Sequence, residues 1–242
     1  MRKIEKRAEP QELTQWRAAN QADPDGSGIN FGYDLLRQSP AVVNRLMDSL
    51  LAEQGGLCAY TGRRIDRETT HVEHLRPQTS WKAQRGLDVA YSNMVGCWPQ
   101  PNGPRSQYGA HPKEDWPAPG EEGLFVSPFS SGCEARFAFN QRGEIKPAKP
   151  ADQAAGTTIE KLKLDNKLLT ALRRQEIESV LGTMRGLSLK EARQRLRGIE
   201  DAEAALNGGA DVQLNPYCFA LKQALDRFIK AGERIKKFAT PD

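Results

Sequence analysis

The stretch TTHVEHLRPQ, residues 69–78, sets two histidines around a glutamate and then stops at Arg76-Pro77. The chain has 3 histidines, and His71 and His74 are two of them. Side chains two residues apart on a strand share a face, so His71 and Glu73 are predicted to lie together. Glu73 and His74 would be read as an ordinary exposed pair if no further polar residues accompanied them.

Length and composition allow a globular protein without covalent staples. The chain has 242 residues, of which 38% are hydrophobic, enough for one large domain or two small ones with a buried core. Cysteines at positions 58, 97, 133 and 218 form no close pair, which favours a reducing compartment. No apolar run has the length of a signal peptide or a membrane span, so we predict a soluble, cytoplasmic protein.

The pattern along the chain predicts three regions: an N-terminal extension and lead-in helix at 1–56, a loop-rich core at 57–150 and a helical region at 151–242. Apolar periodicity and end signals predict helices over 10–20, 41–54, 157–181, 188–206 and 215–238. Glycine, proline and aromatic residues instead dominate 57–145, which predicts hairpins and long loops that carry function.

The chemically versatile residues gather in the loop-rich region. All histidines fall between residues 71 and 111, and Cys58, Cys97 and Asn93 lie in the same region. Imidazole, carboxylate and thiolate are the groups from which divalent-metal sites are built. These residue types therefore predict a divalent-metal site in the loop-rich region.

A series of stretches reaching to about residue 180 carries a family resemblance. They are MRKIEKRAEPQEL, LLAEQGGLCAYTGRRI, HVEHLRPQ, YSNMVGC, FVSPF, FAFNQRGEIKPA and TIEKLKLDNKLLTALRRQEI. Together they resemble the HNH endonuclease family that includes PtuB, the nuclease subunit of Septu-type and retron-associated antiphage systems. The resemblance implies an α+β fold, in which a small ββα-metal core with long loop insertions is flanked by an N-terminal helix and a helical C-terminal half.

The resemblance also implies roles for single residues. His74 would be the general base that activates water, and Glu73 would bind a single divalent ion, Mg²⁺ or Mn²⁺. Asn93 would hold the loop and orient the His74 ring through a hydrogen bond, and His111 would be the second metal ligand. A neutral imidazole suits the base because it accepts a proton from water near pH 7.

Two positions leave alternatives open. Asn102, nine residues after Asn93, could replace His111 as the last metal ligand, but Asn102-Gly103 is also an ordinary turn signal. We favour His111, because Lys113 follows it and the pair suits metal and phosphate contact together. His71 could contact the metal or a phosphate, although a supporting or surface position is the more usual one for such a histidine.

Basic residues around the motif are candidate contacts to nucleic acid. The net charge of +4 permits such contacts without requiring them. The candidates are Arg63, Arg64, Arg76 and Lys113, with Arg85 and Arg105 as further possibilities and a solvated surface as the alternative for all of them.

The chain departs from the family pattern at its cysteines. Relatives commonly carry a Cys-x-x-Cys pair before the glutamate and further cysteines after the asparagine, which together bind a structural zinc. Here the first pair reads Cys58-Ala-Tyr-Thr61, and Tyr108-Gly109 stands where relatives often have Cys-Gly. We therefore expect no structural zinc, with Thr61 and Tyr108 replacing ligands by hydrogen bonding and packing and the helical C-terminal half bracing the loops.

These observations predict a metal-dependent endonuclease that hydrolyses nucleic acid, with DNA favoured. The resemblance implies an antiphage effector that works with a PtuA-type ATPase, and further partners could be a retron reverse transcriptase and its RNA–DNA product. An RNase acting on transfer RNA and a catalytically silent nucleic-acid-binding or scaffold subunit are the alternatives. The sequence leaves cleavage specificity, the activation trigger and the partner's identity open.

Overall fold

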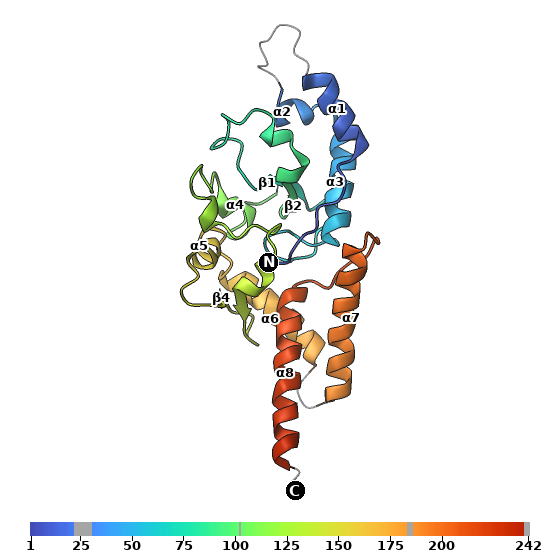
Figure 1. Ribbon diagram of the computed structural model, residues 1–242, viewed down its shortest axis with the longest axis vertical. Coiled ribbons are helices and arrows are strands. Elements are labelled where there is room, and N and C mark those ends of the chain that lie inside the picture. The colour runs from blue at the N-terminus through green and yellow to red at the C-terminus, as the bar shows by residue number, and fades with distance from the viewer. Residues whose placement is uncertain (22–30, 102, 183–185, 240–242) are drawn as a thin grey trace.

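The computed structural model describes residues 1–21, 31–101, 103–182 and 186–239 (Figure 1). The N-terminal helices are α1 (Gln11–Gln21), α2 (Tyr33–Leu36) and α3 (Pro40–Gln54). The middle of the chain forms β1 (His71–His74), the 3-10 turns η1 (Leu87–Val89) and η2 (Tyr91–Asn93), β2 (Met94–Cys97), α4 (Ala110–Lys113), η3 (Glu122–Leu124), η4 (Cys133–Arg136), β3 (Phe137–Phe139) and β4 (Ile145–Pro147). The remaining helices are α5 (Gln153–Lys161), α6 (Lys167–Leu181), α7 (Leu189–Asn207) and α8 (Cys218–Ala239).

The predicted helices over 10–20 and 41–54 are confirmed by α1 and α3. Helix α3 ends at Gly55, whose φ of 61° is left-handed and therefore favours glycine. The Gln54 side chain at the end of this helix bonds the backbone of Gly96 in both directions, at 2.7 Å and 2.8 Å. Helix α3 is thereby joined directly to the strand that pairs with the HVEH motif.

The helix predicted over 157–181 is instead two helices, α5 and α6. Lys163 lies between them with a left-handed φ of 48°, and the Asn166 side chain accepts hydrogen bonds from the first backbone N–H groups of α6. Both features end one helix and begin another, which apolar periodicity alone does not reveal. Helix α7 confirms the prediction at 188–206, and Ser188 and Glu191 form a capping box at its start.

The last helix begins later than predicted. We expected Asn215-Pro216 to start it, but Tyr217 has a left-handed φ of 54° and α8 begins at Cys218. Helices α7 and α8 form an antiparallel hairpin that extends away from the rest of the molecule (Figure 1). Among the described residues, no helix is both long and apolar enough to cross a lipid bilayer.

The sheets are small and antiparallel. Strand β1 pairs with β2, with Glu73 opposite Val95 and His74 opposite Met94, and β3 pairs with β4. The part of the chain after β2 that the structure describes forms only the single turn of α4 where the ββα motif calls for a helix. The mixture of helices and small sheets is compatible with the predicted α+β class, and the ββα-metal core stays a prediction.

Two hydrophobic clusters lie on either side of the β1–β2 pair. One packs α1, α2 and α3 against Val72 and Met94, and the other joins the middle of the chain to α5 through α8. The C-terminal region also holds the turn that contains Cys58, because Tyr217 N–H donates to the Gly62 carbonyl at 2.9 Å. The loops around the motif are therefore braced from the helical half, as expected.

Candidate active site

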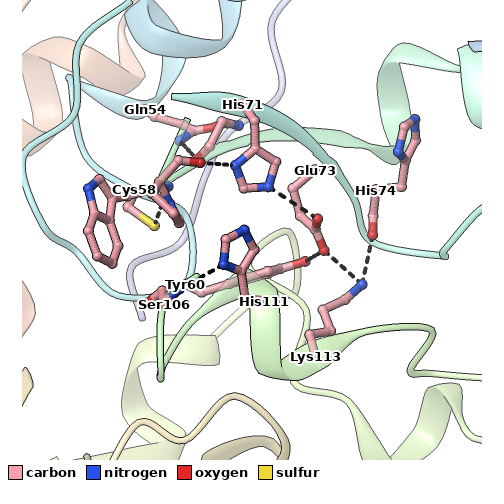
Figure 2. Close-up of polar contacts among 12 residues, drawn as sticks. Gln54, Cys58, Tyr60, His71, Glu73, His74, Ser106, His111 and Lys113 are labelled. Carbon is pink, nitrogen blue, oxygen red and sulfur yellow. Dashed lines mark hydrogen bonds and ion pairs between the residues drawn. The ribbon is translucent and has the colours of Figure 1, made fainter. Parts of the chain in front are cut away.

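Strand β1 separates two groups of polar side chains. Its pleat directs His71 and Glu73 toward α4, whereas Val72 and His74 point toward the N-terminal helices. Figure 2 shows the side chains of the first group converging and the His74 ring directed away from them. The predicted base and the predicted metal-binding carboxylate therefore leave the strand on opposite faces.

Glu73 is the anionic centre of the first group. Its Oε1 accepts hydrogen bonds from Lys113 Nζ at 2.9 Å and from the Tyr60 hydroxyl at 3.4 Å, and its Oε2 lies 3.5 Å from His71 Nε2 (Figure 2). Although burial raises the pKa of Glu73, the charge of Lys113 and the contacts with His71 and Lys113 lower it to about 2. Glu73 is thus a carboxylate at every physiological pH.

His71 has a defined ring orientation. Its Nδ1 makes a short hydrogen bond with the Pro99 carbonyl, which accepts only, so Nδ1 carries the hydrogen. In a neutral His71 ring, Nε2 is then the unprotonated nitrogen, and its lone pair faces Glu73 Oε2. Burial lowers the pKa of His71, but the hydrogen bond and charge of Glu73 outweigh it and raise the pKa above 6.5. A cation, either a proton or a metal ion, is favoured between these two atoms.

His111 has the opposite tautomer. The backbone N–H of Ser106 donates to His111 Nδ1 at 2.8 Å, so Nε2 carries the hydrogen in the neutral ring. Burial, and after it the charge of His71, lowers the pKa of His111. The centroids of the two imidazole rings lie 6.1 Å apart. With one nitrogen occupied by a donor and the other protonated, His111 suits hydrogen-bond donation better than the metal-ligand role predicted for it.

His74 is buried, and within the described residues one of its ring nitrogens makes a hydrogen bond. Nε2 donates to the Asp88 carbonyl at 2.8 Å, which leaves Nδ1 as the lone pair, and the ring packs edge-on against Tyr33 at 4.7 Å. Burial lowers the pKa of His74 and outweighs the raising effects of the Asp88 carbonyl and of Glu73. His74 is therefore neutral and able to accept a proton near pH 7.

Asn93 holds the loop between the strands rather than the histidine ring. Its Oδ1 accepts from the Arg76 backbone N–H at 2.9 Å, and its Nδ2 donates to the carbonyls of Arg76 and Leu87, both at 3.1 Å. The predicted hydrogen bond from Asn93 to His74 is replaced by that of the Asp88 carbonyl. Asn93 thus acts on His74 indirectly, by fixing the loop that presents residue 88.

The predicted phosphate contacts are placed in different environments. Lys113 is only 2% exposed and is paired with Glu73. It is therefore too buried for the phosphate contact that we predicted for it. Arg64 is also committed to structure, because its guanidinium bonds the carbonyls of Gly55 and Leu214. Arg63 donates to the Tyr108 hydroxyl at 3.2 Å and is half-buried, whereas Arg76 is exposed.

The donor set fits a cation with few protein ligands. Glu73 Oε2 and His71 Nε2 converge, and the Nδ1 bond of His71 to a carbonyl is the arrangement that orients metal-binding histidines. Within the described ranges, no group of three or more His, Cys, Asp or Glu side chains could hold a metal ion. Asn102, the alternative last ligand, lies outside the described residues. A carboxylate oxygen and an imidazole nitrogen would leave most positions of a divalent ion to water, as Mn²⁺ and Mg²⁺ prefer, and the imidazole suits Mn²⁺ better than Mg²⁺, which favours oxygen ligands.

The turn at residues 58–61 is held by hydrogen bonds and packing, and not by the four thiolates of a zinc site. Cys58 and Cys97 are buried in contact with one another, and Cys58 Sγ also accepts from the Trp98 N–H at 3.5 Å. Burial raises the pKa of Cys58, but hydrogen bonds from Cys97 and Thr61 lower it to about 5. Tyr108 is buried and stacks on Trp98 at 5.4 Å. Thr61 and Tyr108 thus occupy this turn by hydrogen bonding and packing; the expectation of no zinc stays a prediction.

A polar groove of about 540 Å³ lies along the loop that Asn93 holds. Arg76, whose guanidinium stacks over the Trp81 ring at 4.9 Å, lines it together with other cations and aromatic residues. The lining side chains used below are Phe31, Arg76, Trp81, Lys82, Arg85 and Asp88. Sequence patterns did not single out Lys82, Trp81 or the Asp88 carbonyl, and only their place between His74 and Asn93 could have indicated them.

Comparison with known proteins gives one informative similarity, and no protein-family model matches the chain. The chain is 28% identical over 138 residues to a protein of Vibrio cholerae serotype O1 biovar El Tor described as "Retron Vc95 putative HNH endonuclease". The match covers 55% of this chain and 64% of that relative, which is just under two thirds of its length. This similarity supports an HNH endonuclease family, and with it a nuclease function, for the chain.

Proposed function

We propose that the protein is a metal-dependent endonuclease that hydrolyses phosphodiester bonds of nucleic acid, with DNA as the favoured substrate. The observation that carries this proposal is the tautomer of His74. Its Nε2–H is held by the Asp88 carbonyl, so Nδ1 is the atom that takes a proton from the attacking water. The same carbonyl stabilises the imidazolium that forms, because the charged ring donates a stronger hydrogen bond.

Glu73 and His71 would hold the divalent cation. When bound, Mg²⁺ or Mn²⁺ supplies charge stabilisation to the phosphate oxygens and to the leaving oxygen. Glu73 remains ionised because its pKa is about 2, and the Pro99 carbonyl keeps the Nε2 lone pair of His71 directed at it. In this proposal His71 replaces His111 as the metal-binding histidine, and His111 Nε2–H is left to donate to a phosphate oxygen.

The groove beside the loop provides the nucleic-acid contact in the proposal. Arg76, Lys82 and Arg85 line it and are exposed, so they can neutralise phosphates, and the half-buried Phe31 adds aromatic surface. The groove reaches Asp88, whose backbone carbonyl accepts from His74. A strand bound there must continue past β1 to bring one phosphate to both His74 and Glu73, which leave that strand on opposite faces. Backbone contacts of this kind do not distinguish DNA from RNA, so the substrate is a question for the experiment.

The retron context of the similar protein supports a role in defence. We propose that this chain is likewise an antiphage effector that works with an ATPase partner of the PtuA kind. A retron reverse transcriptase and its RNA–DNA product are further proposed partners. Isolated protein with no activity would then be compatible with nuclease function, so the assay must include the proposed ATPase partner.

The deciding experiment is cleavage of plasmid DNA and of total transfer RNA by the purified chain, with and without the ATPase, in Mg²⁺, Mn²⁺ or EDTA. We expect metal-dependent cutting that falls at least about 100-fold in His74→Ala, the usual size of a lost general base. Arg174→Ala, which changes an exposed residue on α6, serves as the control and should cut normally. If wild type and His74→Ala behave alike on both substrates with the partner present, His74 is not the base of this protein.

A further inference from the structure

Lys113 occupies an unusual position for a lysine beside a candidate metal site. Its side chain is 1% exposed, and its ammonium donates to Glu73 Oε1 and to the His74 carbonyl, both at 2.9 Å (Figure 2). A buried ammonium is costly unless it is paired and hydrogen-bonded, and both acceptors belong to the HVEH strand. One lysine on α4 therefore fixes both the carboxylate and the backbone of the residue that carries the predicted base.

The two oxygens of Glu73 are used differently. Oε1 receives Lys113 and Tyr60, whereas Oε2 faces the Nε2 atom of His71 at 3.5 Å, which is longer than a good hydrogen bond. The side chains of Glu73 and His71 are 16% and 15% exposed, so the pair is partly open to solvent. A metal ion can bind there without displacing Lys113, and the two cations would share one carboxylate.

The charges around Glu73 decide how tightly a divalent cation binds there. Glu73 and Lys113 already sum to zero, so a divalent cation at Oε2 adds two uncompensated positive charges close to an ammonium that cannot move into solvent. Coulomb repulsion is strong at such short range in a partly buried site. An anionic phosphodiester at the same ion removes part of this charge and makes binding of the ion favourable.

We propose that Lys113 is a positioning residue that neutralises Glu73, so that a divalent ion binds at Oε2 of Glu73 together with a phosphodiester anion and only weakly without it. This inference rests on the proposed function for its choice of site. It adds that the metal and the substrate bind cooperatively, which keeps the free protein largely metal-free and inactive. Lys113 itself is too buried to contact the substrate.

Binding of Mn²⁺ alone, measured by calorimetry and by electron paramagnetic resonance, tests the role of the lysine charge. We expect Lys113→Met to bind Mn²⁺ at least about tenfold more tightly than wild type, within the range usual for coupled sites. Lys113→Arg keeps the charge and should bind as weakly as wild type. Lys222→Met removes another lysine that pairs with glutamates, far along the chain on α8, and should leave Mn²⁺ binding unchanged.

The wild-type chain provides a second measurement that needs no substitution. Its Mn²⁺ affinity is measured alone and with diethyl phosphate or with phosphorothioate oligonucleotides of DNA and of RNA. We expect the anion to tighten Mn²⁺ binding about 5-fold to 150-fold, and Mn²⁺ to tighten anion binding by the same factor. The coupling should shrink toward one in Lys113→Met.

The inference is overturned if folded Lys113→Met binds Mn²⁺ no more tightly than wild type. If that variant does not fold, equal Mn²⁺ affinity of wild type with and without every anion overturns it. Failure of the nuclease proposal gives a different result: no nucleic acid is cut, while Lys113→Met still gains Mn²⁺ affinity and diethyl phosphate still couples to the ion.

Discussion

Hydrogen-bond partners decide what each imidazole can do. A carbonyl accepts from His74 Nε2 and another accepts from His71 Nδ1, whereas a backbone N–H donates to His111 Nδ1. The lone pair is therefore on Nδ1 in His74 and on Nε2 in His71. In His111 it is on Nδ1 and already accepts a hydrogen bond. Three residues of the same type are thus suited to proton acceptance, to cation binding and to hydrogen-bond donation.

This assignment predicts opposite effects of two histidine substitutions on metal binding. His71→Ala removes the lone pair that faces Glu73 and should weaken Mn²⁺ binding about tenfold or more, as loss of a group in the metal's surroundings usually does. His111→Ala should change the Mn²⁺ affinity less than about twofold, the usual size for a change away from the binding atoms. Calorimetric titration of Mn²⁺ into each variant, with an oligonucleotide present, makes the comparison. The reverse order would restore His111 as the ligand.

The motif residues were accessible from sequence, but their environments were not. Spacing on a strand correctly joined His71 to Glu73, because the period of two follows from backbone geometry alone. The burial of Lys113 depends on α4 packing against β1, which lies 39 residues earlier in the chain. The tautomers depend on single backbone atoms of residues 88, 99 and 106. Every residue type has the carbonyl used at 88 and 99, and every type except proline has the N–H used at 106, so residue identity gives little signal.

At the scale of elements, the turn after Cys58 is held by α8. Gly62 has a left-handed φ of 73°, and a Cβ there would lie 2.4 Å from the Phe219 ring near the start of that helix. The close approach places the turn, and with it Tyr60, against the helical half of the molecule. Tyr60 then donates to Glu73, so the helix contributes to the site through packing.

Gly62→Ala and Gly120→Ala separate this packing from backbone strain. Gly120 also has a left-handed φ, of 93°, but nothing lies within 4 Å of the position that a Cβ would take there. We expect Gly120→Ala to lower the free energy of unfolding by about 1–2 kcal/mol through strain alone. Gly62→Ala should cost about 1–3 kcal/mol more, because the methyl group also overpacks Phe219. Urea denaturation measures both, and equal losses would mean that the ring moves aside without cost.

Helices were predictable to the extent that local signals define them. Gly55 and the Ser188 box end and begin helices through their own backbone or side-chain geometry, and α3 and α7 were predicted closely. The break between α5 and α6 follows from Lys163 in a left-handed conformation, which its residue type does not favour. A local hydrogen bond closes this turn, because the Leu164 N–H donates to the Ile159 carbonyl at 2.9 Å. The Asn166 cap at the start of α6 is the one signal of the break that the sequence offered.

At the scale of the whole molecule, one glutamate joins distant segments. The carboxylate of Glu134, on η4, accepts from the Lys3 backbone N–H at 3.0 Å and from Lys222 Nζ of α8 at 2.9 Å. Lys222 also pairs with Glu203 of α7. The N-terminal segment, the middle of the chain and the C-terminal hairpin therefore meet at a single charged cluster.

This cluster predicts a pH-dependent share of stability. Burial raises the pKa of Glu134, but the charge and hydrogen bond of Lys222 and the Lys3 N–H lower it below 4.5 in the folded state. A depressed carboxyl pKa stabilises the fold above its unfolded value and loses this effect as the pH falls through the folded pKa. Glu134→Gln should cost about 1 kcal/mol at pH 7, and the difference from wild type should vanish in acid. Denaturation at a series of pH values checks this, and a gap that persists below the folded pKa would contradict it.

The acceptors that hold the rings of His71 and His74 are backbone carbonyls, which limits what amino-acid substitutions can do to them. Every residue type carries a backbone carbonyl, so a point mutation at position 88 or 99 cannot delete the acceptor as it could delete an aspartate that held a ring. A lineage can therefore change the side chains that line the groove while the proton positions on both rings are preserved. Substitutions in the groove can therefore accumulate without changing which ring nitrogens of His71 and His74 carry hydrogen.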